Sequence, residues 1–446
     1  MQPEHRAQPG SQPGGWGSGQ QYGQSSGQPA GQPAARAASW PDGSSAGQGT
    51  AASAQQPPSV PPQVDPQTAG AGSVPTTSSR MTVPGYPSGP AAPAGEKVDT
   101  GPLPSRETLR REARAASSRR GAGDADVERA GELLKSVANI FSQRVVGQEQ
   151  LRRALVTALM SSGHILLESV PGLAKTTAAQ TLASAVSGSF RRIQCTPDLM
   201  PNDIVGTQIL NSSTGEMTTQ LGPVHANIVL LDEINRSSAK TQSAMLEAMQ
   251  ERQTSIGGVV YPLPHPFMVL ATQNPIEEEG TYVLPEAQMD RFLMKEVLTY
   301  PRPSEEADVL DRISNGTFDQ PVTGRPISTD DVEWLQRAAE RVYVDPVIKQ
   351  YIVALINTSR GGGPRPVPGL DRQVRVGASP RGGIALMKVA QAVALQEGRT
   401  YVIPDDVRLL RHGVLRHRLV LTYDALADGI APEAIIDAIF AAVPTP

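Results

Sequence analysis

The chain has 446 residues and nearly balanced charge, with 40 lysines and arginines against 44 aspartates and glutamates, so bulk electrostatics do not favour a nucleic-acid partner. Its single cysteine, Cys195, excludes an intrachain disulfide and agrees with a reducing compartment. We find no secretory signal and no apolar run of the ~18 residues that a membrane span needs, and therefore expect a soluble, cytoplasmic protein.

Residues 1–104 are rich in glycine, proline, glutamine, serine and alanine, and they lack apolar periodicity. Such a segment cannot bury enough apolar surface to offset the entropy of ordering, so the composition predicts a disordered tail. An arginine-rich linker follows over 105–123. Two interpretations of this linker stay open: a solvated charged segment, or a short basic helix that binds an acidic partner.

The segment 124–302 alternates between helical and strand patterns. Apolar residues at helical spacing predict helices over 127–141, 151–159 and 239–252. Short apolar runs predict buried strands over 165–167, 190–195, 228–231, 267–271 and 292–297. Because strands alternate with helices, the pattern predicts an α/β fold whose parallel sheet is flanked by crossover helices.

From residue 303 onward the apolar period is helical only, which predicts a helical second domain over 303–446. Four positions have the chemistry of helix starts: Ser328 with Asp331 three residues later, Asp345-Pro346, Ser379-Pro380 and Pro404. We expect the last of these helices to run through Val414. The glycine- and proline-rich segment 361–376 is predicted to be a loop.

A phosphate-binding loop is predicted between the strand at 165–167 and the helix that follows it. Its residues are Ser169, Val170, Pro171, Gly172, Leu173, Ala174, Lys175, Thr176 and Thr177. We expect backbone N–H groups at the helix N-terminus to face phosphates, Lys175 to add a positive charge, and the Thr176 hydroxyl to bind Mg²⁺. Ser169 and Ala174 stand where the usual pattern has glycines, and a strand–turn–helix that binds nothing is the alternative.

Polar side chains follow the next buried strands, where ligands of parallel sheets bind. Asp232 and Glu233 end one apolar run, so we expect Asp232 to hold Mg²⁺ and Glu233 to polarise the attacking water. Asn274 follows the next strand, where it could orient that water or form a turn. Arg381 lies in the first turn of a helix, where a bound phosphate would offset its unfavourable interaction with the helix dipole; a solvated arginine is the alternative.

Several short segments recur together in a known family. They are 168–176 (ESVPGLAKT), 196–198 (TPD), 230–236 (LLDEINR), 240–243 (KTQS), 246–251 (LEAMQE), 271–275 (ATQNP), 284–292 (LPEAQMDRF) and 377–381 (GASPR). With these motifs the sequence over roughly 130–446 resembles the MoxR family of AAA+ ATPases. The segment 361–371 is longer than the linker that the family usually has there. The resemblance does not extend to residues 1–120.

The resemblance implies an ASCE-type parallel sheet, a helical lid and assembly into a ring, usually a hexamer. It implies that Asn274 is sensor 1, Arg381 is sensor 2, and Arg291 is an arginine finger that reaches a neighbour's γ-phosphate. A local salt bridge of Arg291 with Asp290 or Glu286 is the alternative. Val146 and Gly147 would contact adenine, and residues 207–222 would form a β-hairpin directed at the central pore or a client.

The implied function is Mg²⁺-dependent ATP hydrolysis that remodels or activates a protein client, such as one with a von Willebrand A domain. Two other interpretations remain open. Ser169 and Ala174 motivate an ATP-binding switch that does not hydrolyse, because Cβ atoms there could crowd the phosphates. The related rings of magnesium chelatase motivate the ATPase subunit of a metal-chelatase-like complex.

Overall fold

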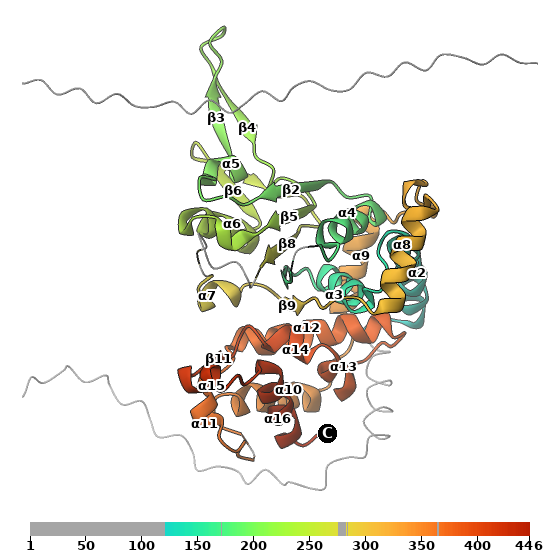
Figure 1. Ribbon diagram of the computed structural model, residues 1–446, viewed down its shortest axis with the longest axis vertical. Coiled ribbons are helices and arrows are strands. Elements are labelled where there is room, and N and C mark those ends of the chain that lie inside the picture. The colour runs from blue at the N-terminus through green and yellow to red at the C-terminus, as the bar shows by residue number, and fades with distance from the viewer. Residues whose placement is uncertain (1–120, 171, 275–281, 283, 364) are drawn as a thin grey trace, which may run out of the picture. The chain divides into compact units, whose positions relative to one another are not determined.

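The computed structural model describes residues 121–446, apart from 171, 275–281, 283 and 364 (Figure 1). The predicted tail over 1–104 and most of the predicted linker over 105–123 lie outside the described residues. In the described part of the chain, no helix is long and apolar enough to cross a membrane.

A five-stranded parallel sheet forms the centre of the α/β part, as the sequence predicted. Its strands are β1 (Ile165–Glu168), β2 (Phe190–Gln194), β5 (Ile228–Asp232), β8 (Met268–Gln273) and β9 (Met294–Val297). They lie in the order β2-β5-β8-β1-β9, and every neighbouring pair is parallel. Because all five strands run the same way, their carboxyl ends meet at one edge and their amino ends at the other.

Alternate residues of the central strands belong to two hydrophobic clusters, one on each face of the sheet. In β1, Ile165 and Leu167 pack into the larger cluster, and Leu166 packs into the smaller one. Helices α2 (Asp124–Arg144), α3 (Glu149–Met160) and α4 (Lys175–Ala185) bury their apolar faces in the larger cluster. Helix α6 (Ala239–Glu251) packs into the smaller one. Burial on both faces explains why these strands read as continuous apolar runs.

Two β-hairpins are inserted between the sheet strands. Strands β3 (Gly206–Leu210) and β4 (Met217–Leu221) pair antiparallel after the short helix α5 (Pro201–Val205), and they extend away from the sheet (Figure 1). This is the hairpin predicted at 207–222. The second hairpin, β6 (Gln253–Ile256) with β7 (Val259–Pro262), was not predicted. Its turn is Gly257-Gly258 with φ of 59° and 81°, a hairpin signal present in the sequence.

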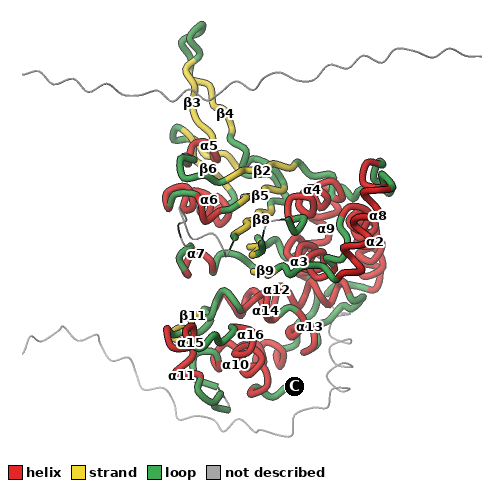
Figure 2. The backbone as a smooth tube through the Cα atoms, viewed as in Figure 1, coloured by secondary structure: helices red, strands yellow, loops and turns green. Residues whose placement is uncertain are grey.

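Helices dominate the chain from residue 303, as Figure 2 shows. They are α8 (Pro303–Ser314), α9 (Thr329–Glu340), α10 (Pro346–Thr358), α12 (Pro380–Gln396), α13 (Pro404–Leu409), α14 (Arg411–Leu415), α15 (Tyr423–Ala427) and α16 (Pro432–Ala442), with a 3₁₀ turn at Thr317–Asp319. The predicted helix starts are confirmed. Ser328 Oγ accepts a hydrogen bond from the Asp331 N–H at 3.1 Å, and prolines occupy the first turns of α10, α12 and α13.

Two details of this region differ from the prediction. The segment 361–376 is not a loop throughout, because it contains α11 (Leu370–Gln373) and β10 (Val374–Val376), which pairs antiparallel with β11 (Val420–Leu421). The helix expected from Pro404 through Val414 is broken at Leu410, whose φ and ψ are −112° and 24°. The β10–β11 pair joins segments that are far apart in the chain, so it leaves no local hydrophobic period from which the sequence could predict it.

Candidate active site

The carboxyl edge of the sheet gathers four predicted site residues. The loop that leads to Lys175 follows β1, Asp232 ends β5 with Glu233 directly after it, and Asn274 follows β8. Since β5, β8 and β1 are adjacent in the sheet, these residues lie along one edge. Asn274 is buried, with 5% of its surface exposed. The structure therefore brings Lys175, Asp232, Glu233 and Asn274 together, as the strand-end rule predicts.

The Lys175 ammonium group contacts the start of the loop that follows β1. Lys175 is the first residue of α4, and its Nζ donates a hydrogen bond to the Ser169 carbonyl oxygen at 3.4 Å. Gly172 has a φ of 87°, and Ala174 has a φ of 53° in the left-handed region. This is a turn into a helix N-terminus, where backbone N–H groups and the helix dipole favour anions. Pro171 lies outside the described residues.

Ala174 adopts the conformation that a glycine at this position would adopt without cost. The left-handed region costs a residue with a Cβ atom about 1–2 kcal/mol. Helix α4 still starts regularly, because Ala174 O accepts its first hydrogen bond, from the Ala178 N–H at 2.8 Å. Ser169, at the other glycine position, is buried, and its Oγ donates to the Val170 carbonyl oxygen at 3.0 Å.

A cavity of about 830 Å³ opens beside this loop. Gly172, Leu173, Ala174 and Thr177 form one wall, and apolar side chains form much of the rest, among them Val146, Tyr300, Leu310 and Phe318. Gly147, with a φ of 68°, lies next to Val146, and the Glu305 side chain packs over its α-carbon. Apolar walls next to a helix N-terminus suit a ligand with a flat apolar base at one end and phosphates at the other.

The Asp232 carboxylate is held by two neighbouring strands. Its Oδ1 accepts a hydrogen bond from Thr272 Oγ1 at 2.7 Å. Its Oδ2 accepts from Arg192 Nε at 3.1 Å and Nη2 at 2.5 Å. Thr176, the other predicted Mg²⁺ ligand, is half-buried in the first turn of α4. Among the described residues, no group of three or more histidine, cysteine or acidic side chains is placed to hold a metal ion by itself. Thr176 and Asp232 would therefore hold Mg²⁺ only together with phosphate oxygens and water, as Mg²⁺ commonly binds.

Glu233 also occupies a left-handed conformation, with φ of 58° and ψ of 54°. Its backbone N–H donates to Thr272 Oγ1 at 2.8 Å. Its Oε2 accepts from Gln194 Nε2 at 3.0 Å and from Arg236 Nη1 at 3.2 Å. Such strain persists only where the surroundings fix the residue, and it is common at functional sites.

Arg192, Gln194 and Thr272 were missed by sequence reasoning, although all three contact the predicted acidic pair. Gln194 stands opposite Asp232 in the parallel pairing of β2 with β5. Arg192 Nη2 also donates to Gln194 Oε1 at 2.8 Å, which links the two β2 side chains. Only the strand order and register, which the sequence pattern does not contain, would have identified them.

Arg291 lies at the opposite edge of the sheet. It comes three residues before the start of β9, and β9 pairs in parallel with β1 so that Met294 stands opposite Ile165. The Leu293 N–H donates to the His164 carbonyl oxygen at 2.8 Å, which fixes this approach at the amino end of β1. The loop bearing Lys175 follows the other end of β1, four residues or roughly 13 Å away. The structure therefore does not bring Arg291 to the phosphate-binding loop of its own chain.

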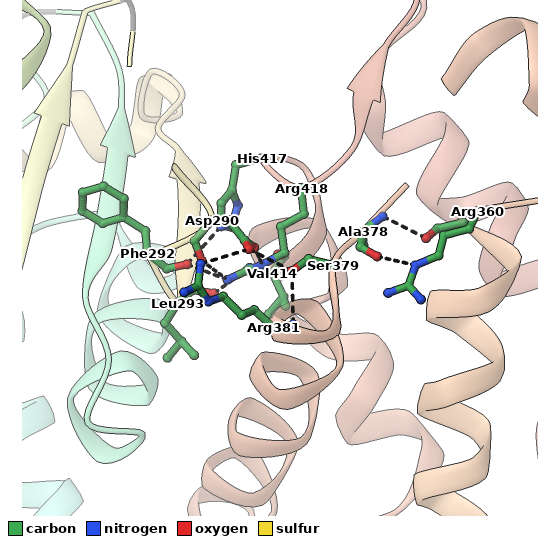
Figure 3. A network of polar contacts seen from close by, with 11 residues as sticks. Asp290, Phe292, Leu293, Arg360, Ala378, Ser379, Arg381, Val414, His417 and Arg418 are labelled. Carbon is green, nitrogen blue, oxygen red and sulfur yellow. Dashed lines mark hydrogen bonds and ion pairs between the residues drawn. The ribbon is translucent and has the colours of Figure 1, made fainter. Parts of the chain in front are cut away.

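Asp290 ties the start of α12 to the residues beside Arg291 (Figure 3). Asp290 Oδ1 accepts a hydrogen bond from Arg418 Nε at 2.9 Å, and Oδ2 accepts from Ser379 Oγ at 2.8 Å. Arg381 Nη1 lies 3.7 Å from the same Oδ2. Arg381 is in the first turn of α12, as predicted, yet it lies near Arg291 rather than near Lys175.

The side chain of Arg418 is 2% exposed, and burial lowers its pKa to about 10.

The two acidic residues that were the alternative salt-bridge partners of Arg291 contact other residues instead. Asp290 contacts Arg418, Ser379 and Arg381, while Glu286 Oε1 pairs with Arg375 Nη2 at 3.0 Å. Arg291 itself is exposed to solvent.

A second cavity, of about 310 Å³, lies at this amino edge. Its lining contains five basic side chains and one acidic side chain: Arg252, Arg291, Arg381, Lys388, Arg418 and Asp290. Such a concentration of positive charge in a concave surface favours an anionic partner. The lining of the cavity beside the phosphate-binding loop is a separate set of residues.

Two family models match the chain. The model described as "ATPase family associated with various cellular activities (AAA)" matches residues 164–294, which contain four of the five sheet strands and the first residue of β9. The model of the AAA lid domain matches residues 370–439. Residues 295–369 lie between the two matches.

The chain is 48% identical to Chaperone MoxR1 of Mycobacterium tuberculosis over 302 residues, which are 68% of this chain and 79% of the relative. It is 45% identical to the uncharacterized protein YeaC of Bacillus subtilis, over 70% of this chain and 95% of the relative. A crystal structure from Cytophaga hutchinsonii, provisionally described as an ATPase, matches with a TM-score of 0.68 and 40% identity over 75% of this chain and 99% of that one. With these matches and the loop, acidic pair and lid described above, the chain belongs to the MoxR family of AAA+ ATPases.

Proposed function

We propose that the protein hydrolyses ATP with Mg²⁺ in the cytoplasm as a ring of identical subunits, and that the ring remodels or activates a protein client. The observation that carries this proposal is the position of Arg291. It lies at the amino edge of the sheet, whereas Lys175, Asp232, Glu233 and Asn274 lie at the carboxyl edge. We assign Arg291 to the catalytic site as its arginine finger. A complete site then needs the amino edge of one subunit against the carboxyl edge of the next.

Within one subunit, the residues of the carboxyl edge divide the work of phosphoryl transfer. The loop N–H groups and Lys175 bind the phosphates, and Thr176 and Asp232 hold Mg²⁺. Bound Mg²⁺ neutralises charge on the phosphate oxygens. Glu233 accepts a hydrogen bond from the attacking water, and Asn274 orients that water. Val146 and Gly147 contact the adenine.

The neighbouring subunit supplies the remaining positive charge. Arg291 is the arginine finger, and Arg381 acts beside it, because the two share one basic cavity and Asp290 holds the start of α12 there. Such fingers contribute about 10³–10⁵ in rate in GTPases. An interface between different patches of identical subunits repeats head to tail and closes into a ring when its rotation allows. We propose a hexamer, as the resemblance to the family implies.

A mixing experiment tests the shared site. Arg291→Ala and Lys175→Ala should each assemble and each lose nearly all ATPase activity. Mixed, they should regain part of it, because some interfaces then pair an intact loop with an intact finger. Wild-type turnover in Arg291→Ala, or no recovery in rings shown to contain both variants, would contradict the proposal.

The β3–β4 hairpin is the surface that we assign to the client. It exposes four large apolar side chains, Ile209, Leu210, Met217 and Leu221, with between 45% and 60% of their surface accessible. Exposed apolar groups on a projecting hairpin favour protein binding. The similar Mycobacterium tuberculosis protein is named a chaperone, which supports a protein client, and we propose one with a von Willebrand A domain.

Client capture tests this assignment. Glu233→Gln with ATP should slow hydrolysis, hold the ring in its ATP state and retain the client in a pull-down. Adding Leu210→Ser and Met217→Ser should release the client while the ring still forms. Retention of the client by that triple variant would contradict the assignment to the hairpin.

One observation favours a second candidate, an ATP-binding switch that does not hydrolyse. Ala174 lies in the left-handed region within the phosphate-binding loop, where a residue with a Cβ atom is strained. Phosphate release separates the two functions. A rate in wild type that falls in Glu233→Gln supports hydrolysis, and saturable ATP binding without any phosphate release supports the switch.

A further inference from the structure

Helix α8 is amphipathic, yet none of its residues is buried. It exposes Leu310 and Ile313 one turn apart, with 65% and 60% of their surface accessible. Two acidic residues, Glu306 and Asp311, lie on the same helix and are exposed. A pair of apolar side chains at i and i+3 is the anchor pattern of a helix that binds in an apolar groove.

A groove of about 420 Å³ lies between α10 and α12. Its apolar lining includes Ile352, Val353, Ile356, Ile384 and Met387, and two basic residues, Lys349 and Arg360, also line it. Val353 and Ile384 are 67% and 53% exposed. The groove therefore presents an uncovered apolar floor with positive charge beside it.

The charges of α8 and the groove are complementary. Acidic Glu306 and Asp311 accompany the apolar pair on the helix, while Lys349 and Arg360 line the groove. The arginine-rich segment 105–120 of the same chain is a poor occupant by comparison, because its six arginines would meet like charge.

Each surface also borders one of the two cavities of the proposed shared site. Glu306 and Leu310 line the cavity beside the phosphate-binding loop. Ile384 lines both the groove and the basic cavity that contains Arg291 and Arg381. Placing α8 of one subunit in the groove of the next would therefore bring the basic cavity toward the loop that binds the phosphates.

We infer that the α10–α12 groove receives helix α8 of the neighbouring subunit. The inference rests on the proposed ring and names the surfaces that align it. Leu310 and Ile313 enter the apolar floor, and the acidic residues of α8 meet the lysine and arginine of the groove. The contact covers the outer side of the nucleotide cavity, so assembly and nucleotide binding strengthen each other.

Thiol cross-linking tests the contact directly. Ile313→Cys and Val353→Cys are prepared as separate full-length proteins, mixed with ATP, and treated with a short bismaleimide. The natural Cys195 does not interfere, because it is 2% exposed and burial raises the pKa of its thiol to about 12. The mixture should give a covalent dimer that neither variant gives alone.

Tyr423→Cys, at a position that is 81% exposed on α15, replaces Val353→Cys as the matched control and should give no dimer. A ring that forms and hydrolyses ATP without cross-linking in the Ile313/Val353 mixture overturns the groove assignment and leaves the proposed function intact. A wild-type chain that stays monomeric with ATP overturns both. Cross-linking equal to that of the Tyr423 control also overturns the assignment.

Charge exchange gives a second test. Lys349→Glu should raise the protein concentration needed for half-assembly about tenfold, and adding Asp311→Lys should restore assembly. Both positions are exposed, so the melting temperature should not change. Assembly that is unaffected by Lys349→Glu, or a loss that Asp311→Lys deepens, contradicts the inference.

Discussion

Ala174 shows how a single residue sets the conformational energy of the phosphate-binding loop. Its φ of 53° is left-handed, and glycine adopts that region without the Cβ penalty. We expect Ala174→Gly to raise the free energy of unfolding by about 1 kcal/mol, because the strain that it removes outweighs the added freedom of the unfolded chain. Urea denaturation measures the change.

Gly172 provides the matched control in the same loop. Its φ is 87°, and a Cβ atom there would meet no other atom within 4 Å, so only backbone strain would be added. Gly172→Ala should therefore lower the free energy of unfolding by about 1–2 kcal/mol. An unchanged or lower stability of Ala174→Gly would show that the loop has a different backbone conformation in solution.

His164 makes stability depend on pH. It is buried at the amino end of β1, where Nδ1 accepts from the Val269 N–H at 3.0 Å and Nε2 lies 3.1 Å from the Met249 carbonyl oxygen. Burial, with a smaller contribution from the nearby Arg252 charge, lowers its pKa to about 3. Protonation would place a second hydrogen against the Val269 N–H, so the folded protein keeps the ring neutral.

The sign of the pH effect follows from this lowered pKa. In the unfolded chain the histidine pKa is about 6.5, so below that pH the unfolded state binds the proton first. The contribution of His164 is fully present above about pH 6.5 and is lost as the pH falls toward 3, by up to about 1.4 kcal/mol per pH unit. His417, whose pKa burial also lowers, acts in the same direction.

Unfolding in urea between pH 7.5 and 5 measures the effect. His164→Gln should lose stability at pH 7.5 but show a shallower decline than wild type as the pH falls, since one of the two buried histidines is gone. Equal slopes in variant and wild type would show that His164 is protonated in the folded protein.

The partners of the acidic pair mark the limit of sequence reasoning at this scale. Asp232, Glu233 and Asn274 could be predicted, because each follows an apolar run at a strand end. Arg192 and Thr272 could not, because they belong to strands that are distant in the chain and reach Asp232 only through the sheet register.

Between secondary-structure elements, Asp290 joins the sheet to the lid. Arg418 is nearly fully buried against it, so Asp290→Ala would leave a buried charge without its carboxylate. Removing one member of such a pair typically costs about 3–5 kcal/mol, and we expect a loss of that size in urea denaturation.

Glu286→Ala is the control for Asp290→Ala. The Glu286–Arg375 pair is about half exposed on both side chains, so its loss should stay within about 0.5 kcal/mol. Similar losses in both variants would mean that Arg418 finds another partner or water when Asp290 is absent.

Helices and strands were predicted correctly where a buried face gives apolar residues at a regular spacing in the sequence. The five sheet strands and the capped helices were predicted because apolar runs and cap residues are local signals. The β10–β11 pair was not, since Val374 and Leu421 pair across 46 intervening residues and each strand is too short to show alternation. The break at Leu410 also lacks a proline or glycine to mark it.

At the scale of the whole molecule, the proposed sharing of the site between subunits would link activity to concentration. We expect ATPase activity per subunit to fall on dilution, in parallel with loss of assembly in sedimentation at the same concentrations. Arg291→Ala added in excess should replace partners and reduce the activity of the wild-type protein, because wild-type loops then face neighbours that lack the finger. Constant activity per subunit down to the concentration at which the chain is monomeric would place the complete site within one chain.

The separation of nucleotide loop and arginine on opposite edges of one parallel sheet gives every subunit a front and a back. In an open row of the proposed head-to-tail assembly, one terminal subunit holds a loop that no neighbour's Arg291 reaches, and the other terminal subunit holds an Arg291 that reaches no loop. Such a row has one working site fewer than it has members, and only closure makes the two numbers equal. An open dimer would have one complete site for two chains, and therefore half the turnover per chain of a closed ring. Turnover per chain thus reports whether the ring is closed.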